Sequence, residues 1–80
     1  MNKRKLAVVE LDSGYEGLYL FDKLVNEGNP LNEGNERFLY FIDLLDNYEL
    51  DISDIHFGFA SDLEEFPMFL SEIEGILWEN

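Results

Sequence analysis

Apolar residues of the β-branched and aliphatic kind dominate the first part of the chain. Residues 5–12 read Lys-Leu-Ala-Val-Val-Glu-Leu-Asp, a composition typical of a mostly buried strand. Residues 52–60 predict another strand, because large apolar side chains alternate there with polar or small ones. Because this alternation has a period of two, Ile55, Phe57 and Phe59 lie on one apolar face.

Helical spacing appears in the middle and at the end of the chain. Between residues 36 and 48 the apolar positions that share one helical face are Phe38, Phe41, Ile42 and Leu45. A capping-box match at Ser61-Asp62-Leu63-Glu64 precedes the last pattern. Because Pro67 would interrupt a helix interior, we expect a short turn at 62–65 and a helix from about 66 to 78. Its core-facing residues are Phe66, Phe69, Leu70, Ile73 and Leu77.

Residues 13–28 support two interpretations. Ser13-Gly14-Tyr15-Glu16 matches a capping box and Gly28 suits a helix end, which together predict a helix over 14–27. Leu18-Tyr19-Leu20-Phe21 suits a sheet equally well, which would give a strand at 18–25 paired with the first strand through a turn at 13–17.

The connection that follows is rich in turn-forming residues. Over 26–35 the tetrapeptide Asn-Glu-Gly-Asn occurs twice around Pro30-Leu31, which predicts a loop. The elements add up to one α+β domain over residues 1–80, small and two-layered, in the order β-α-α-β-α. The alternative order is β-β-α-β-α with an N-terminal hairpin.

The composition fits a folded protein. The chain has 80 residues, 46% of them apolar, enough to bury one core. It lacks cysteine, which fits the cytoplasm, or the host cytoplasm if the chain is phage-encoded. The apolar run before Glu10 has only four residues, fewer than the apolar region of a signal peptide needs, so we expect no signal peptide. No run reaches the length that spans a bilayer, and the net charge of −13 disfavours both anionic membranes and nucleic acid as direct partners.

Residue patterns that carry catalysis are missing from the sequence. There is no cysteine, and His56 is the single histidine, for which we expect a structural role. The acidic group Asp46, Glu49, Asp51 and Asp54 lacks the ligand spacing and central glycine of a calcium loop. Gly14-Tyr15-Glu16-Gly17 lacks the lysine of a phosphate-binding loop. We therefore expect no enzyme activity, no metal and no cofactor.

The charges are distributed unevenly. All five basic residues lie within the first 37 positions, whereas positions 38–80 carry eleven Asp and Glu. If residues 62–79 are helical, six acids lie along about 27 Å, at about 1.5 Å of rise per residue. That is one charge per about 4.5 Å, close to the spacing of about 3.4 Å along one DNA strand.

These charges predict a surface that binds a basic protein. We expect Tyr40 on the middle helix and Met68 on the last helix to point outward as apolar anchors within an acidic rim. The predicted partner-binding residues are Glu36, Tyr40, Asp43, Asp46, Glu49, Asp51, Asp54, Asp62, Glu64, Glu65, Met68, Glu72 and Glu79.

In size, acidity and lack of catalytic motifs the chain resembles small phage inhibitors that mimic nucleic acid, such as anti-restriction proteins, uracil-DNA glycosylase inhibitor and some anti-CRISPR proteins. This resemblance is one of composition and transfers no residue roles. It implies an inhibitor of a nuclease or another nucleic-acid-binding enzyme. The alternatives are an immunity or antitoxin protein that neutralises a basic toxin, and an acidic structural adaptor.

Overall fold

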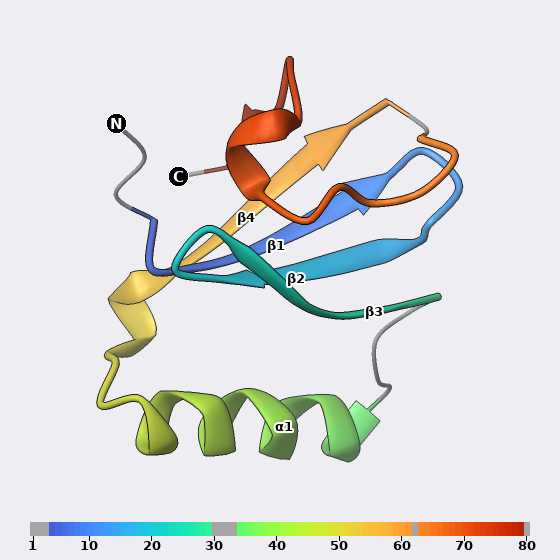
Figure 1. The fold of residues 1–80 in the computed structure, drawn as a ribbon. Coiled ribbons are helices and arrows are strands. Elements are labelled where there is room, and N and C mark those ends of the chain that lie inside the picture. Colours follow the sequence, from blue (N-terminus) through green and yellow to red (C-terminus); the bar gives the residue numbers. More distant parts are fainter. Residues whose placement is uncertain (1–3, 30–33, 62, 80) are drawn as a thin grey trace.

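The structure, a computed structural model, describes residues 4–29, 34–61 and 63–79 and is organised around one sheet (Figure 1). Its strands are β1 (Leu6–Leu11), β2 (Glu16–Leu20), β3 (Lys23–Gly28), β4 (Ile55–Ala60) and β5 (Leu77–Trp78). The one α-helix among the described residues is α1 (Gly34–Asn47), and two short 3₁₀ helices are η1 (Ile52–Asp54) and η2 (Leu70–Glu72).

The sheet has the strand order β3-β2-β1-β4-β5. β1, β2 and β3 form an antiparallel meander, while β4 returns to the other side of β1 and runs parallel to it. Because β4 runs parallel to β1, the chain must cross over the sheet before it enters β4, and this crossover connection contains α1. The register places Val8 opposite both Leu18 of β2 and Phe57 of β4, so β1 is the central strand.

The central strands are buried on both faces. On one face α1 packs against the sheet, in a cluster formed by Leu6, Val8, Leu18, Leu20 and Phe41. On the other face the C-terminal segment packs, in a cluster formed by Ala7, Val9, Leu11, Tyr19, Ala60, Phe66, Leu70 and Ile73. Figure 1 shows α1 and this orange-to-red segment on opposite sides of the sheet. Burial on both faces explains why residues 6–9 form a continuous apolar run.

The close approach of the C-terminal segment depends on glycine. A Cβ atom at Gly17 would lie 2.7 Å from Cδ1 of Phe66, nearer than two carbon atoms can pack. The Phe66 ring therefore lies directly on the backbone of β2, with its edge also toward Tyr19 at a centroid distance of 6.3 Å.

Three predicted elements are confirmed. The strand at 5–12 is β1, the helix at 36–48 is α1, and the strand at 52–60 is β4, with residues 52–54 forming η1 instead of extended chain. The α+β class is also confirmed. The predicted orders are wrong in detail, since the described elements run β-β-β-α-β-β. Of the predicted loop at 26–35, residues 30–33 lie outside the described residues.

The helix predicted over 14–27 is wrong, and the hairpin alternative describes this region better. β2 pairs antiparallel with β1, and the chain turns back into β3 at Phe21 and Asp22, with φ angles of 50° and 76°. Two successive positive φ angles are typical of a tight hairpin turn, which usually carries Asn-Gly. Phe-Asp gave no such signal, so the third strand was missed.

The helix predicted over 66–78 is also wrong. Pro67 has no N–H to donate, Phe69 is extended and bridges to Lys23, and Gly75 has a φ of 72°. The Asp22 carboxylate accepts hydrogen bonds from the Ser71 N–H at 2.9 Å and the Ser71 hydroxyl at 3.3 Å. These contacts hold the segment against β3 as irregular chain with one 3₁₀ turn.

The turn at Phe21 carries backbone strain that a substitution can relieve. Phe21 is 56% exposed, and a non-glycine residue in the left-handed region costs about 1 kcal/mol. We expect Phe21→Asn to raise the free energy of unfolding by about 0.5–1 kcal/mol, because asparagine tolerates positive φ. Urea denaturation measures this. Phe69→Asn, at a similarly exposed site with ordinary extended backbone, is the control and gains nothing.

Tyr19 joins β2 to the C-terminal segment. Its side chain is fully buried, and its hydroxyl donates a 2.7 Å hydrogen bond to the carbonyl of Pro67. Burial, followed by the negative charges of Glu27, Glu72 and Asp22, raises the pKa of this hydroxyl well above its ordinary value. The folded protein therefore keeps the Tyr19 proton at pH values where the unfolded chain releases it.

This shift predicts a loss of stability at alkaline pH. Because the folded pKa is raised, the contribution of Tyr19 is complete below about pH 10 and falls as pH rises above the unfolded value. Tyr19→Phe is expected to cost about 1 kcal/mol at pH 7 through the lost hydrogen bond. It should also flatten the fall in unfolding free energy above about pH 10. Tyr48→Phe, at an exposed tyrosine, leaves that fall unchanged; an equal effect of both substitutions would contradict the assignment.

Candidate functional site

An apolar hollow lies between α1 and β4. We call it the α1–β4 groove; its volume is about 430 Å³ and it is lined by Phe38, Phe41, Ile42, Leu45, Ile52, Ile55 and Phe57. Phe38 is 67% and Ile52 77% exposed. Large apolar side chains that stay this exposed around one hollow mark an interaction surface more often than a solvated face.

The groove exists because α1 covers only part of its side of the sheet. Phe41 is the buried residue of α1 and packs with side chains of β1 and β2. Tyr40 points away from β4 and toward β3. Its hydroxyl accepts a 3.0 Å hydrogen bond from the side-chain amide of Asn26 on β3. On the other flank the Phe41 ring meets the edge of Phe57 at a centroid distance of 6.5 Å, and this contact forms the inner wall of the groove.

Apolar surface continues from the groove across β4 and β5. Phe59 lies two residues beyond Phe57 on the same strand, and it pairs with Leu77 of β5. Directly paired residues of antiparallel strands share a face, so both side chains lie on the α1 side of the sheet. Phe59 and Leu77 are exposed. The uncovered surface therefore extends to the edge of the sheet.

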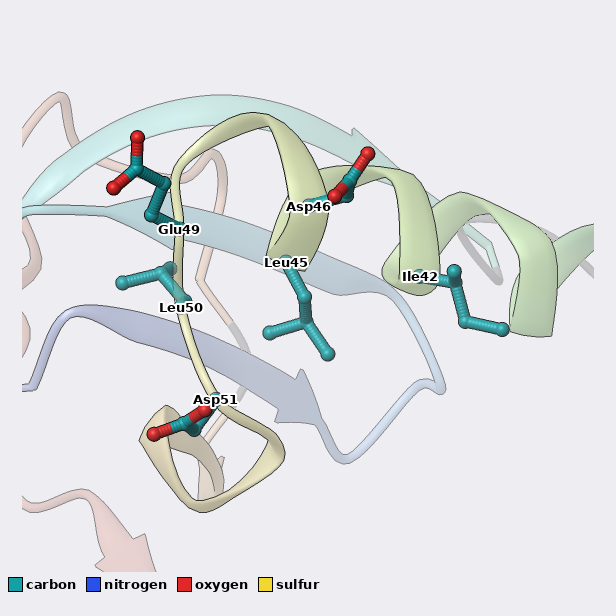
Figure 2. Close-up of a pocket in the computed structure, with 6 residues that line it drawn as sticks. All are labelled: Ile42, Leu45, Asp46, Glu49, Leu50 and Asp51. Carbon is teal, nitrogen blue, oxygen red and sulfur yellow. The ribbon is translucent and has the colours of Figure 1, made fainter.

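Carboxylates border one end of this surface. A second hollow, the acidic pocket, is lined by Ile42, Leu45, Asp46, Glu49, Leu50 and Asp51. Figure 2 shows Leu45 and Leu50 within it, with Asp51 across from Asp46 and Glu49. Ile42 and Leu45 line both hollows. The apolar groove thus adjoins a hollow that is bordered by three exposed acidic residues.

A bidentate ion pair fixes α1 against the sheet. Arg37 Nη1 lies 2.6 Å from Glu16 Oε1, and Nη2 lies 3.1 Å from Oε2. The Glu16 side chain is 9% and the Arg37 side chain 28% exposed, so the pair is partly shielded from water, and loss of one partner would leave a poorly solvated charge. It joins the first turns of α1 to β2, and in this way sets the position of the helix beside β4.

The predicted partner-binding residues divide between two sides of the molecule. Those on α1 or on the chain that leads from it to β4 are Glu36, Tyr40, Asp43, Asp46, Glu49, Asp51 and Asp54. Those on the opposite segment are Glu64, Glu65, Met68 and Glu72, while Glu79 follows β5 and Asp62 lies outside the described residues. Within the first group, Asp46, Glu49 and Asp51 converge on one hollow.

Two expectations about these residues are corrected. Tyr40 does not project outward, because it packs against the core and bonds to Asn26. The line of charge expected along a helix at 62–79 does not form, since the described part of that segment has no α-helix. Met68 is exposed, yet it lies beside β3, where its carbonyl accepts a hydrogen bond from the Leu24 N–H.

The groove residues were not recognised from the sequence. Helical spacing predicts Phe38 and Ile42 on the core face of the helix, and the alternation over 52–60 predicts Phe57 on the apolar face of its strand. The available signal was an excess of apolar faces, because the single α-helix of the described residues cannot cover every apolar strand residue. That signal was masked by the two additional helices that the sequence predicted.

His56 occupies a packed position on β4. Its ring meets the edge of Trp78 at a centroid distance of 6.5 Å, and the Arg4 guanidinium lies 3.9 Å from the centre of the Trp78 ring on its face. Within the described residues, no group of three or more His, Cys, Asp or Glu side chains is arranged to hold a metal ion.

No protein-family model, curated protein or solved structure shows significant similarity to the chain. Across residues 4–29, 34–61 and 63–79, no helix is both long and apolar enough to pass through a bilayer. The functional interpretation therefore depends on the surface itself.

Removing the arginine of the ion pair tests how α1 is held. Arg37→Met leaves the shielded Glu16 carboxylate without its bidentate partner, and we expect the free energy of unfolding to fall by about 1–3 kcal/mol. Lys5→Met is the matched control, because Lys5 is exposed and lies 4.0 Å from Asp54; it should cost less than about 0.5 kcal/mol. Equal costs in urea denaturation would show that the Arg37 pair does not fix the helix.

Proposed function

We propose that this protein is a non-enzymatic acidic protein that binds and inhibits a basic partner protein. The partner class we expect is a nuclease or another nucleic-acid-binding enzyme. One observation carries the proposal: among the described carboxylates of positions 38–80, only Asp54 has an ion pair, with Lys5 at 4.0 Å. Arg37, the basic residue nearest to that half in sequence, is occupied by Glu16.

Unpaired carboxylates on one surface attract a cationic protein and repel nucleic acid and other anions. Attraction of this kind mainly raises the rate of encounter, and apolar contacts then supply most of the affinity. The acidic pocket and the adjoining groove provide both components on the α1 side. The combination of an apolar groove with an acidic pocket also favours the second candidate, a protein that neutralises a basic toxin through a specific anchor. It favours this candidate over an inhibitor that imitates only the charge spacing of DNA.

The proposal is tested by capture on the immobilised protein from lysate at about 0.05 M salt, followed by elution with rising salt to about 0.5 M. We expect a basic protein that elutes as the salt rises, whose purified activity is inhibited and for which nucleic acid competes. The triple variant Asp46→Asn, Glu49→Gln, Asp51→Asn should bind it about tenfold more weakly, equivalent to about 1.4 kcal/mol.

The matched control neutralises three exposed carboxylates on the opposite side, with Glu64→Gln, Glu65→Gln and Glu74→Gln. It should weaken the same complex less than threefold. A complex that is indifferent to salt, or one that both triple variants weaken equally, would be evidence against a steering surface on the α1 side.

A further inference from the structure

The uncovered half of the α1 side has the width of one helix. Five strands about 4.8 Å apart span about 19 Å between the outer strands, whereas a helix with its side chains is about 10 Å wide. α1 lies over β1 and β2 and reaches β3 through Tyr40. The α1–β4 groove lies beside it at β4, and β5 is the next strand of the sheet, so the remaining width is about that of one further helix.

The walls of the groove carry apolar side chains at the spacing that helix packing uses. Phe38, Ile42 and Leu45 are three and four residues apart on the flank of α1 that lines the groove, which makes one apolar stripe. Ile55 and Phe57 lie two residues apart on β4 and form the floor. A helix that presents its own apolar stripe would contact both surfaces at once.

Charge decides which kind of helix fits. The groove adjoins the acidic pocket, because Ile42 and Leu45 line both hollows. The acidic residues of that pocket are Asp46, Glu49 and Asp51. The described residues supply no basic side chain to either hollow. A second copy of this chain would bring another net charge of −13 against the same carboxylates, at an electrostatic cost. A segment with lysine or arginine beside its apolar stripe meets both features.

We propose that the α1–β4 groove binds an amphipathic basic helix of the partner protein, which lies beside α1 and completes the helical layer of the sheet. This deepens the proposed function, on which it rests, by naming the element of the partner that docks. The apolar stripe of that helix fills the groove between Phe38 and Phe57. Its lysine or arginine side chains lie over the acidic pocket.

A synthetic peptide tests this binding mode on the intact protein. The probe is a blocked peptide of about 18 residues, five turns, with leucines along one face and lysines elsewhere. A scrambled peptide of identical composition has no apolar face. We expect the amphipathic peptide to bind at least tenfold more tightly than the scrambled one, to gain helical circular dichroism when bound, and to shift the NMR methyl signals of Ile42, Ile52 and Ile55.

Matched variants locate the binding. Phe38→Ser and Ile52→Ser together should weaken binding of the amphipathic peptide at least tenfold, because both side chains are exposed walls of the groove. Leu63→Ser, at an exposed apolar residue of the C-terminal segment, should change it less than twofold. Circular dichroism of the free variants confirms that the fold is retained.

Three other outcomes would each contradict the proposal that a basic helix binds the groove. Equal binding of the two peptides would mean attraction by charge alone, which leaves the proposed function standing and removes the helix. Sedimentation that shows a dimer abolished by Phe38→Ser would mean that a second copy occupies the groove. If neither peptide binds at about 0.05 M salt, the steering surface itself fails.

Discussion

A single α-helix cannot cover one side of a five-stranded sheet, and this mismatch in width determines most of the molecule's surface. β1 and β2 are buried on both faces because α1 and the C-terminal segment pack on opposite sides of them. The Arg37–Glu16 ion pair joins α1 to β2, and the hydrogen bond that the Asn26 side-chain amide donates to the Tyr40 hydroxyl joins α1 to β3. β4 and β5 are therefore left uncovered on the α1 side, with Phe57, Phe59 and Leu77 exposed.

An uncovered apolar surface would favour self-association. Here the same surface borders Asp46, Glu49 and Asp51, and a net charge of −13 opposes the approach of another copy. The acidity thus has two consequences that need no separate explanation. Like charge opposes contact between identical chains, and under the proposed function it favours a partner that brings positive charge to the same surface. We propose that the position of the apolar groove and the sign of the surrounding charge together determine which partner the protein binds.

Much of the central structure follows from sequence periodicity. The apolar run of β1, the helical stripe of α1 and the alternation of β4 each had a single strong interpretation. The ends of the sheet did not. Phe21 and Asp22 form a positive-φ turn without asparagine or glycine, so the local sequence does not indicate β3.

Residues 66–78 have helical spacing because Phe66, Leu70 and Ile73 all face the core. Their conformation is set by Asp22, Lys23 and Tyr19, which are distant in sequence. The predicted acids at the pocket were identified by charge, whereas the groove required knowing that only one helix covers the sheet.

The most direct test of this account asks whether the groove is open to solvent in the free protein. Methyl NMR of dilute protein with a soluble paramagnetic agent reports the accessibility of each isoleucine, valine and leucine side chain. The account predicts strong broadening for Ile42 and Ile52, and little for Leu6, Val8 and Leu18, which are buried beneath α1. Protection of Ile42 and Ile52 equal to that of Leu18 would show that the groove is already covered, and would contradict the account.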